Sequence, residues 1–138
     1  MRVALKAGCV YFAIVFAIGF AMGALRVLVT APRLGETAAL LAELPIMLGA
    51  SWLVCGWILR RWRVGNSVAA RAVMGGLAFA LLMIAEAMLA RFGFGRSLAV
   101  HLASYREPLA LAGLAMQIVF AAIPLLRLAR VAPRNDRV

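Results

Sequence analysis

Four long apolar runs are the feature that most restricts how this chain can fold. They fall at about residues 7–29, 37–59, 68–90 and 109–129. Each is close to the roughly 20 residues that a helix needs to cross the hydrocarbon core of a bilayer. Hydrophobic residues make up 66% of the 138-residue chain and charged residues only 14%, proportions that soluble domains do not have. The sequence therefore predicts an all-α membrane protein, an antiparallel bundle of four transmembrane helices.

The first apolar run follows Arg2 and Lys6, as the core of a secretory signal peptide would. It is longer than a usual signal core, and three further runs follow it, so we expect it to be retained as a span. Residues 1–130 are expected to form a single transmembrane domain, and residues 131–138 a polar cytoplasmic tail. The connection 91–108 is either a loop or a short interfacial helix, because Leu98, Leu102 and Tyr105 recur at helical spacing.

The distribution of Lys and Arg predicts the orientation. The positive-inside rule places the flanks richer in these residues in the cytoplasm. A cytoplasmic N-terminus puts ten basic residues inside and five outside. The inner set is Arg2, Lys6, Arg60, Arg61, Arg63, Arg71, Arg127, Arg130, Arg134 and Arg137, and the outer set is Arg26, Arg33, Arg91, Arg96 and Arg106. We therefore expect both termini to be cytoplasmic.

The net charge of +10 suggests nucleic-acid binding in a soluble protein, but here the basic residues are divided among the flanks of apolar runs. The expected partner is the lipid bilayer, with no nucleic acid. The basic residues are 14 Arg and one Lys, a bias typical of GC-rich bacterial genomes, and the expected location is a bacterial inner membrane.

Residue patterns of catalytic or metal sites are missing from the sequence. Cys9 and Cys55 are the only cysteines, which is too few for a disulfide framework or a zinc site. Catalytic Ser, His and Asp sets and phosphate-binding glycine loops are also missing. We expect no cofactor, no metal and no enzymatic activity, although a lipid-modifying reaction with Glu43 or Glu86 as the base stays open.

Each apolar run carries one strong polar group in the half predicted to be outer: Arg26, Glu43, Glu86 and Gln117. A rise of about 1.5 Å per residue converts sequence position into depth along antiparallel helices. On this scale Glu86 is level with Arg26, Glu43 lies about 4 to 5 Å deeper, and Gln117 about 7 to 8 Å deeper. We predict that the four side chains converge into one intramembrane polar cluster.

A charge in hydrocarbon costs about 2.5 to 3.5 kcal/mol at a helix centre, so these groups should face inward and pair. Arg26 is expected between the two carboxylates, meeting Glu43 or Glu86, because a guanidinium offers several donors. Gly19 and Gly23 precede it on nearly the same face and should let a neighbouring helix approach. The alternative is that Arg26 bends to the lipid headgroups without a partner.

Two prolines fall inside the predicted spans. Pro45 is either close enough to a helix start to be tolerated, or it opens the helix and frees a carbonyl beside Glu43. Pro124 lies deeper and removes the usual hydrogen-bond partner of the Phe120 carbonyl, which predicts a kink or hinge. Gln117 shares a face with Pro124 and is expected to form a hydrogen bond between helices.

Two functions fit this pattern. We favour a structural or accessory subunit, in which the polar cluster locks the helices together and the chain binds another membrane protein or a second copy of itself. The alternative is a small proton- or anion-coupled transporter or channel that uses the same cluster. Its difficulty is that the sequence shows no polar exit path through the inner half.

Overall fold

The computed structural model describes residues 1–130, and every regular element in this range is helical. The predicted polar cytoplasmic tail, residues 131–138, lies outside the described residues. The elements are α1 (Arg2–Leu25), η1 (Arg26–Thr30), α2 (Ala31–Leu34), α3 (Glu36–Arg61), α4 (Val68–Met88), η2 (Leu89–Gly93), α5 (Leu98–Ser104) and α6 (Pro108–Ala129). The η elements are π-helical turns that continue the helices before them. Four helices of the described part are long and apolar enough to cross a membrane, which suggests a membrane location.

Each predicted run lies within one of these helices, but the first helix is longer at both ends. It runs from Arg2 to Leu34 rather than over 7–29. Pro32 does not end it, because this residue falls in the first turn of α2, just after η1, where a proline is tolerated. The chain breaks at Gly35 instead, whose φ of +83° favours a residue without a Cβ.

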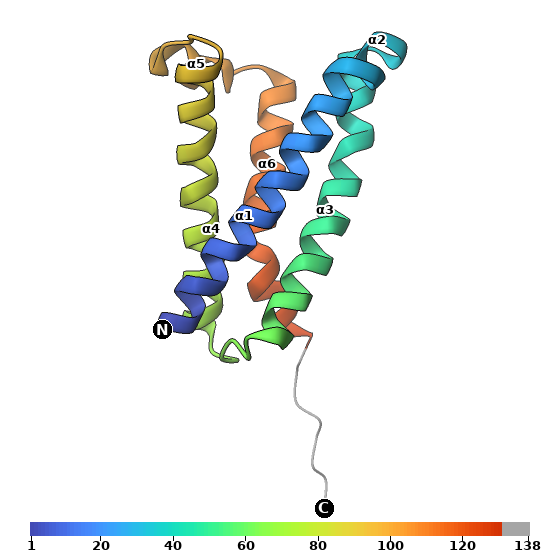
Figure 1. Cartoon of the computed structure of the whole chain (residues 1–138). Coiled ribbons are helices and arrows are strands. Elements are labelled where there is room, and N and C mark those ends of the chain that lie inside the picture. The colour runs from blue at the N-terminus through green and yellow to red at the C-terminus, as the bar shows by residue number, and fades with distance from the viewer. Residues whose placement is uncertain (131–138) are drawn as a thin grey trace, which may run out of the picture.

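The long helices alternate in direction and form a ring (Figure 1). α1 packs against α3 and α4, and α6 packs against the same two helices from the other side. The start of α1, the α3–α4 connection and the end of α6 lie at one end, which we call the basic end (Figure 1). α2 and α5 lie at the other end, which we call the α5 end. α1 crosses the bundle obliquely, starting beside α4 and finishing beside α3.

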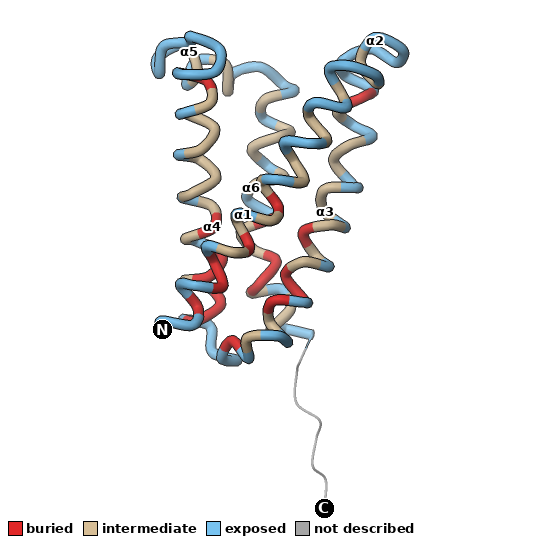
Figure 2. The backbone as a smooth tube through the Cα atoms, in the orientation of Figure 1, coloured by how far each residue is buried: buried red, intermediate tan, exposed pale blue. Residues whose placement is uncertain are grey.

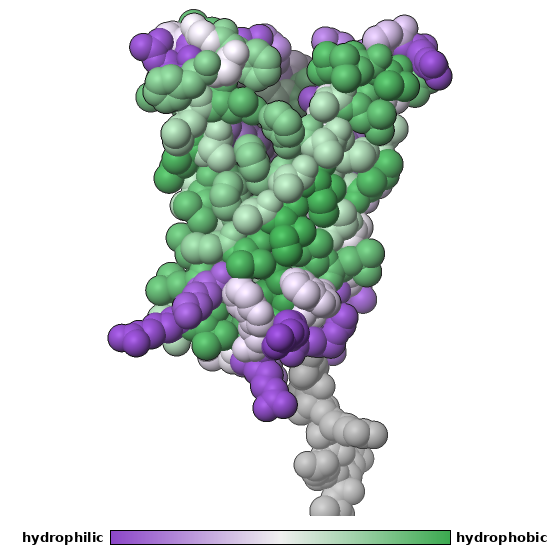
Figure 3. Space-filling model, in the orientation of Figure 1, coloured by the Kyte–Doolittle hydropathy of each residue, from purple (hydrophilic) through white to green (hydrophobic). Residues whose placement is uncertain are grey.

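The core is concentrated in the half near the basic end (Figure 2). Its fully buried members include Ala7, Tyr11, Cys55, Ile58 and Met74. The face seen in Figure 3 is mostly apolar along the helices, and hydrophilic residues gather at its two ends. Only 6–17% of the most apolar stretch of each long helix is buried, so most of this surface needs an apolar environment outside the chain.

Two serines begin the helices that follow the longer connections. Ser67 Oγ accepts a hydrogen bond from the Ala70 N–H at 3.2 Å, and Ser97 Oγ accepts one from the Val100 N–H at 3.3 Å. These side chains satisfy amide groups that the first turn of a helix leaves free. The connection 91–108 therefore contains a short helix, α5, with Leu98 and Leu102 exposed.

Candidate functional site

Arg26 and Glu43 form the one ion pair found among residues 1–130. The distance from Arg26 Nη1 to Glu43 Oε2 is 3.5 Å, with 32% of the arginine side chain and 13% of the glutamate side chain exposed. Glu43 Oε2 is buried and accepts no hydrogen bond within residues 1–130, so the contact is ionic. Arg26 opens η1 and Glu43 lies on α3, so the pair links the first two long helices. The alternative, in which Arg26 bends to the lipid headgroups without a partner, therefore does not hold.

Glu86 and Gln117 form a second pair, between α4 and α6. Gln117 Nε2 donates a hydrogen bond to Glu86 Oε1. The Tyr105 hydroxyl donates to Glu86 Oε2 at 3.5 Å and lies 3.5 Å from His101 Nε2. Burial and the Glu86 carboxylate raise the pKa of Tyr105, which keeps its proton available for this bond. A cavity of 210 Å³ adjoins the pair and is lined by Glu86, Leu89, Ala90, Phe94, Arg96 and His101.

The four predicted residues form two bonded pairs rather than one bonded cluster. Within residues 1–130, no ion pair or hydrogen bond joins Arg26 or Glu43 to Glu86 or Gln117. The oblique course of α1 (Figure 1) accounts for this pairing, since η1, which begins at Arg26, packs against α3. Depth along a helix follows from sequence position, whereas the side of the bundle depends on how the helices cross.

The two predicted packing glycines behave differently. A Cβ at Gly19 would lie 3.3 Å from Met47 Cε, so α1 and α3 do approach there. A Cβ at Gly23 would meet no atom within 4 Å, so its predicted packing role is wrong. The tightest contacts lie in the basic half, where a Cβ at Gly8 would be 2.8 Å from the Met74 carbonyl oxygen and one at Gly75 would collide with the Ala121 carbonyl.

Pro45 and Pro124 both lie inside continuous helices. Pro45 is the tenth residue of α3, so it does not lie at the helix start, and α3 continues past it to Arg61. Because proline has no backbone N–H, the carbonyl of Leu41, four residues earlier, lacks its usual helix partner. α6 likewise continues through Pro124 to Ala129. The carbonyl that Pro124 frees, that of Phe120, accepts a hydrogen bond from the Tyr11 hydroxyl at 3.1 Å.

Tyr11 is therefore a polar residue that the sequence analysis missed. It is fully buried, and its ring stacks on Phe120 with a centroid distance of 4.4 Å. The sequence holds a signal for this contact, because Tyr11 lies nine residues after the start of α1 and Phe120 nine before the end of α6. The two residues are thus at equal depth, and a freed carbonyl in an apolar layer needs a donor.

Two arginines at the basic end were also missed, because their position near the helix ends indicated only orientation. Arg71 on α4 is 4% exposed, and it donates from Nε to the Gly65 carbonyl at 3.1 Å and from Nη2 to Asn66 Oδ1 at 2.7 Å. Arg127 on α6 donates from Nη2 to the Trp52 carbonyl at 2.7 Å. Its guanidinium lies 4.4 Å from the centre of the Trp52 ring, a cation–π contact.

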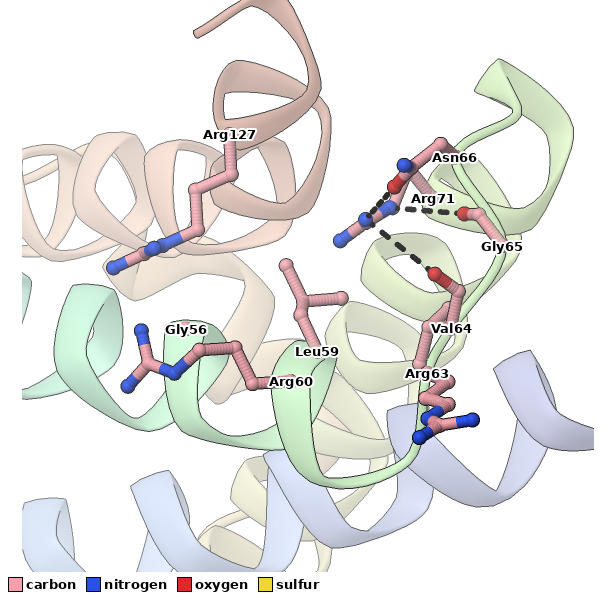
Figure 4. Close-up of a pocket in the computed structure, with 9 residues that line it drawn as sticks. All are labelled: Gly56, Leu59, Arg60, Arg63, Val64, Gly65, Asn66, Arg71 and Arg127. Atoms are coloured by element: carbon pink, nitrogen blue, oxygen red, sulfur yellow. Dashed lines mark hydrogen bonds between the residues drawn. The ribbon is translucent and has the colours of Figure 1, made fainter. Parts of the chain in front are cut away.

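Gly56 explains why Arg127 turns inward. It lies one turn after Trp52 on α3, and a Cβ there would overlap the Arg127 guanidinium. Arg71 and Arg127 both line a cavity of 470 Å³ at the basic end (Figure 4). Polar side chains therefore line a cavity at the basic end, which the sequence did not indicate.

No family model, curated protein or solved structure matches this chain.

Proposed function

We propose that the chain is a multi-pass protein of a bacterial inner membrane, with both termini in the cytoplasm, and that it is a structural or accessory subunit. The apolar sides of the bundle and the excess of basic residues at one end support this placement. The polar groups of the α5 half support the role, because they are paired with each other across helices.

The observation that carries this proposal is the pairing of each carboxylate. Glu43 is held by Arg26, and Glu86 by Gln117 and Tyr105. The first pair joins α3 to the end of the first helix, and the second joins α4 to α6. These contacts stabilise helices in a half of the molecule where few residues are buried. A group that conducts protons or ions needs a continuous path, which two separate pairs do not supply.

A companion in the membrane is the partner that this role requires, either another membrane protein or a second copy of the chain. Extraction of the native bilayer in polymer-bounded discs, followed by native mass spectrometry, tests it. The proposal predicts particles with a second protein chain at fixed stoichiometry, present at the same ratio after further purification. Particles that contain one copy of the chain and only lipid would contradict the accessory role.

One observation favours transport as a second candidate. Cavities lie at both ends of the bundle, beside Glu86 and beside Arg71, and the buried contact of Tyr11 with Phe120 lies between the two ends. A transporter that alternates between two open states would have this arrangement. Reconstituted liposomes containing a pH-sensitive dye distinguish the candidates: we expect no proton flux above protein-free vesicles. Flux that Glu86→Gln abolishes would establish transport instead.

A further inference from the structure

The cavity at the basic end is surrounded by positive charge. Four arginines are among its lining residues, Arg60, Arg63, Arg71 and Arg127. None of the four glutamates in residues 1–130 lines it. In Figure 4 the side chains of Arg60 and Arg127 extend to one side of the cavity, Arg71 lies on the other side, and Arg63 points away. The described residues therefore supply cations here without a counter-charge.

Arg71 is held rigidly with one nitrogen free. Its Nε and Nη2 atoms bind Gly65, Asn66 and, at 3.5 Å, the Val64 carbonyl, so the loop fixes the orientation of the guanidinium. Its Nη1 atom is buried, has no hydrogen-bond partner, and points toward the cavity (Figure 4). A buried guanidinium donor without an acceptor is unfavourable, and an anion in the cavity would satisfy it.

Arg127 presents a similar feature from the opposite wall. Its Nη2 is held by the Trp52 carbonyl and its plane by the Trp52 ring, while its Nε is buried without a partner. Arg71 and Arg127 thus both line the cavity, and each carries a buried donor without a partner. Guanidinium groups bind phosphate oxygens through paired, charge-assisted hydrogen bonds, and this preference decides the class of anion.

We infer that this cavity binds a phosphate group. Its volume of 470 Å³ is within the range of small-ligand sites, and Leu59 and Val64 add apolar walls. The inference uses the proposed membrane placement only to name the source of the phosphate. Basic pockets between transmembrane helices at the cytoplasmic surface bind the headgroups of anionic lipids. The second source is free inorganic phosphate, which shares the same chemistry.

Native mass spectrometry of the full chain in detergent tests the site, with titration of phosphatidylglycerol, diacylglycerol, which lacks the phosphate group, or inorganic phosphate. Retention of phosphatidylglycerol over diacylglycerol, with no phosphate adduct, identifies a lipid headgroup. Adducts with inorganic phosphate show that the phosphate alone suffices. Equal retention of the two lipids together with no phosphate adduct would overturn the inference. This readout is independent of any protein partner, so it fails separately from the accessory role.

Matched variants localise the binding. Arg127→Gln and Arg60→Gln each remove one lining charge, and Arg61→Gln removes a neighbouring charge that does not line the cavity. Loss of a charge-assisted hydrogen bond should weaken binding of the anion about tenfold in the first two variants and hardly at all in the third. Arg60 is exposed, so its substitution tests the site even if Arg127→Gln fails to fold. Equal affinities in all three variants would place the anion elsewhere.

Discussion

The Arg26–Glu43 pair lies in the part of the bundle that the proposed placement puts in the bilayer, where an isolated charge is unfavourable. Arg26→Leu removes the cation and leaves a mostly buried carboxylate without a partner. We expect the variant to lose about 2 to 3 kcal/mol of stability, since an isolated charge within a bilayer is unfavourable by about this amount. The measurement is the thermal unfolding midpoint in detergent, together with the folded yield.

The double variant separates the pair from a general effect of losing an arginine. Adding Glu43→Gln to Arg26→Leu removes the unpaired charge and should restore part of the loss. Arg33→Leu, an exposed position on α2, is the control and should have little effect. If Arg26→Leu unfolds at the parent temperature, the pairing does not contribute to stability.

A second prediction at the scale of single residues concerns Tyr11 and Pro124. Tyr11→Phe keeps the ring stacked on Phe120 but removes the donor to its carbonyl, which should cost about 1 to 3 kcal/mol. Pro124→Ala restores the backbone N–H that a helix uses for this carbonyl. In the Pro124→Ala background, Tyr11→Phe should therefore cost much less. A thermal double-mutant cycle with equal losses in both backgrounds would show that the hydroxyl does not replace the missing helix bond.

At the scale of elements, the face of the helix on which a glycine lies decides whether a side chain can be added there. Gly75 and Gly76 are neighbours on α4, but a Cβ at Gly75 would collide with the Ala121 carbonyl of α6, and one at Gly76 would meet nothing within 4 Å. Gly75→Ala should force α4 and α6 apart and lower the unfolding temperature strongly. Gly76→Ala is the matched control and should be neutral or stabilising by about 0.5 to 1 kcal/mol.

The same comparison bears on the predicted glycine motif. Gly23→Ala should behave as Gly76→Ala does, because no neighbouring atom lies near either position. Unfolding midpoints for the three variants in one detergent check the ranking. A Gly75→Ala variant as stable as Gly76→Ala would mean that α4 and α6 do not pack as described.

The sequence predicts the four long helices well, because the length and apolar composition of each run are enough to indicate a helix that can cross a membrane. It also predicts the contact of Arg26 with Glu43, since a fixed rise per residue brings the two to similar depths. It does not show that α1 crosses from α4 to α3, and this crossing separates Arg26 from Glu86 (Figure 1). The inward turn of Arg127 was hidden for a related reason, because the space for it is left by Gly56 on another helix.

At the scale of the whole molecule, charge is distributed unequally between the ends. The four glutamates of the described chain all belong to the α5 half, and the basic end carries arginines and a lysine without them. This asymmetry is what the positive-inside rule would produce if the basic end is cytoplasmic. It also supplies the basic cavity, so orientation and anion binding depend on the same residues.

The membrane placement and orientation are the central claim, because the proposed role, the account of the apolar sides and the lipid source of the phosphate depend on them. Ser67 and Ser97 provide a matched pair of probes, each at the start of a helix and at opposite ends of the bundle. The measurement is labelling of Ser67→Cys and Ser97→Cys with a membrane-impermeant maleimide in intact cells, in a background with Cys9→Ala and Cys55→Ala. We predict labelling of Ser97→Cys from outside and of Ser67→Cys only after permeabilisation. The reverse pattern, or equal labelling of both positions in intact cells, would contradict the account.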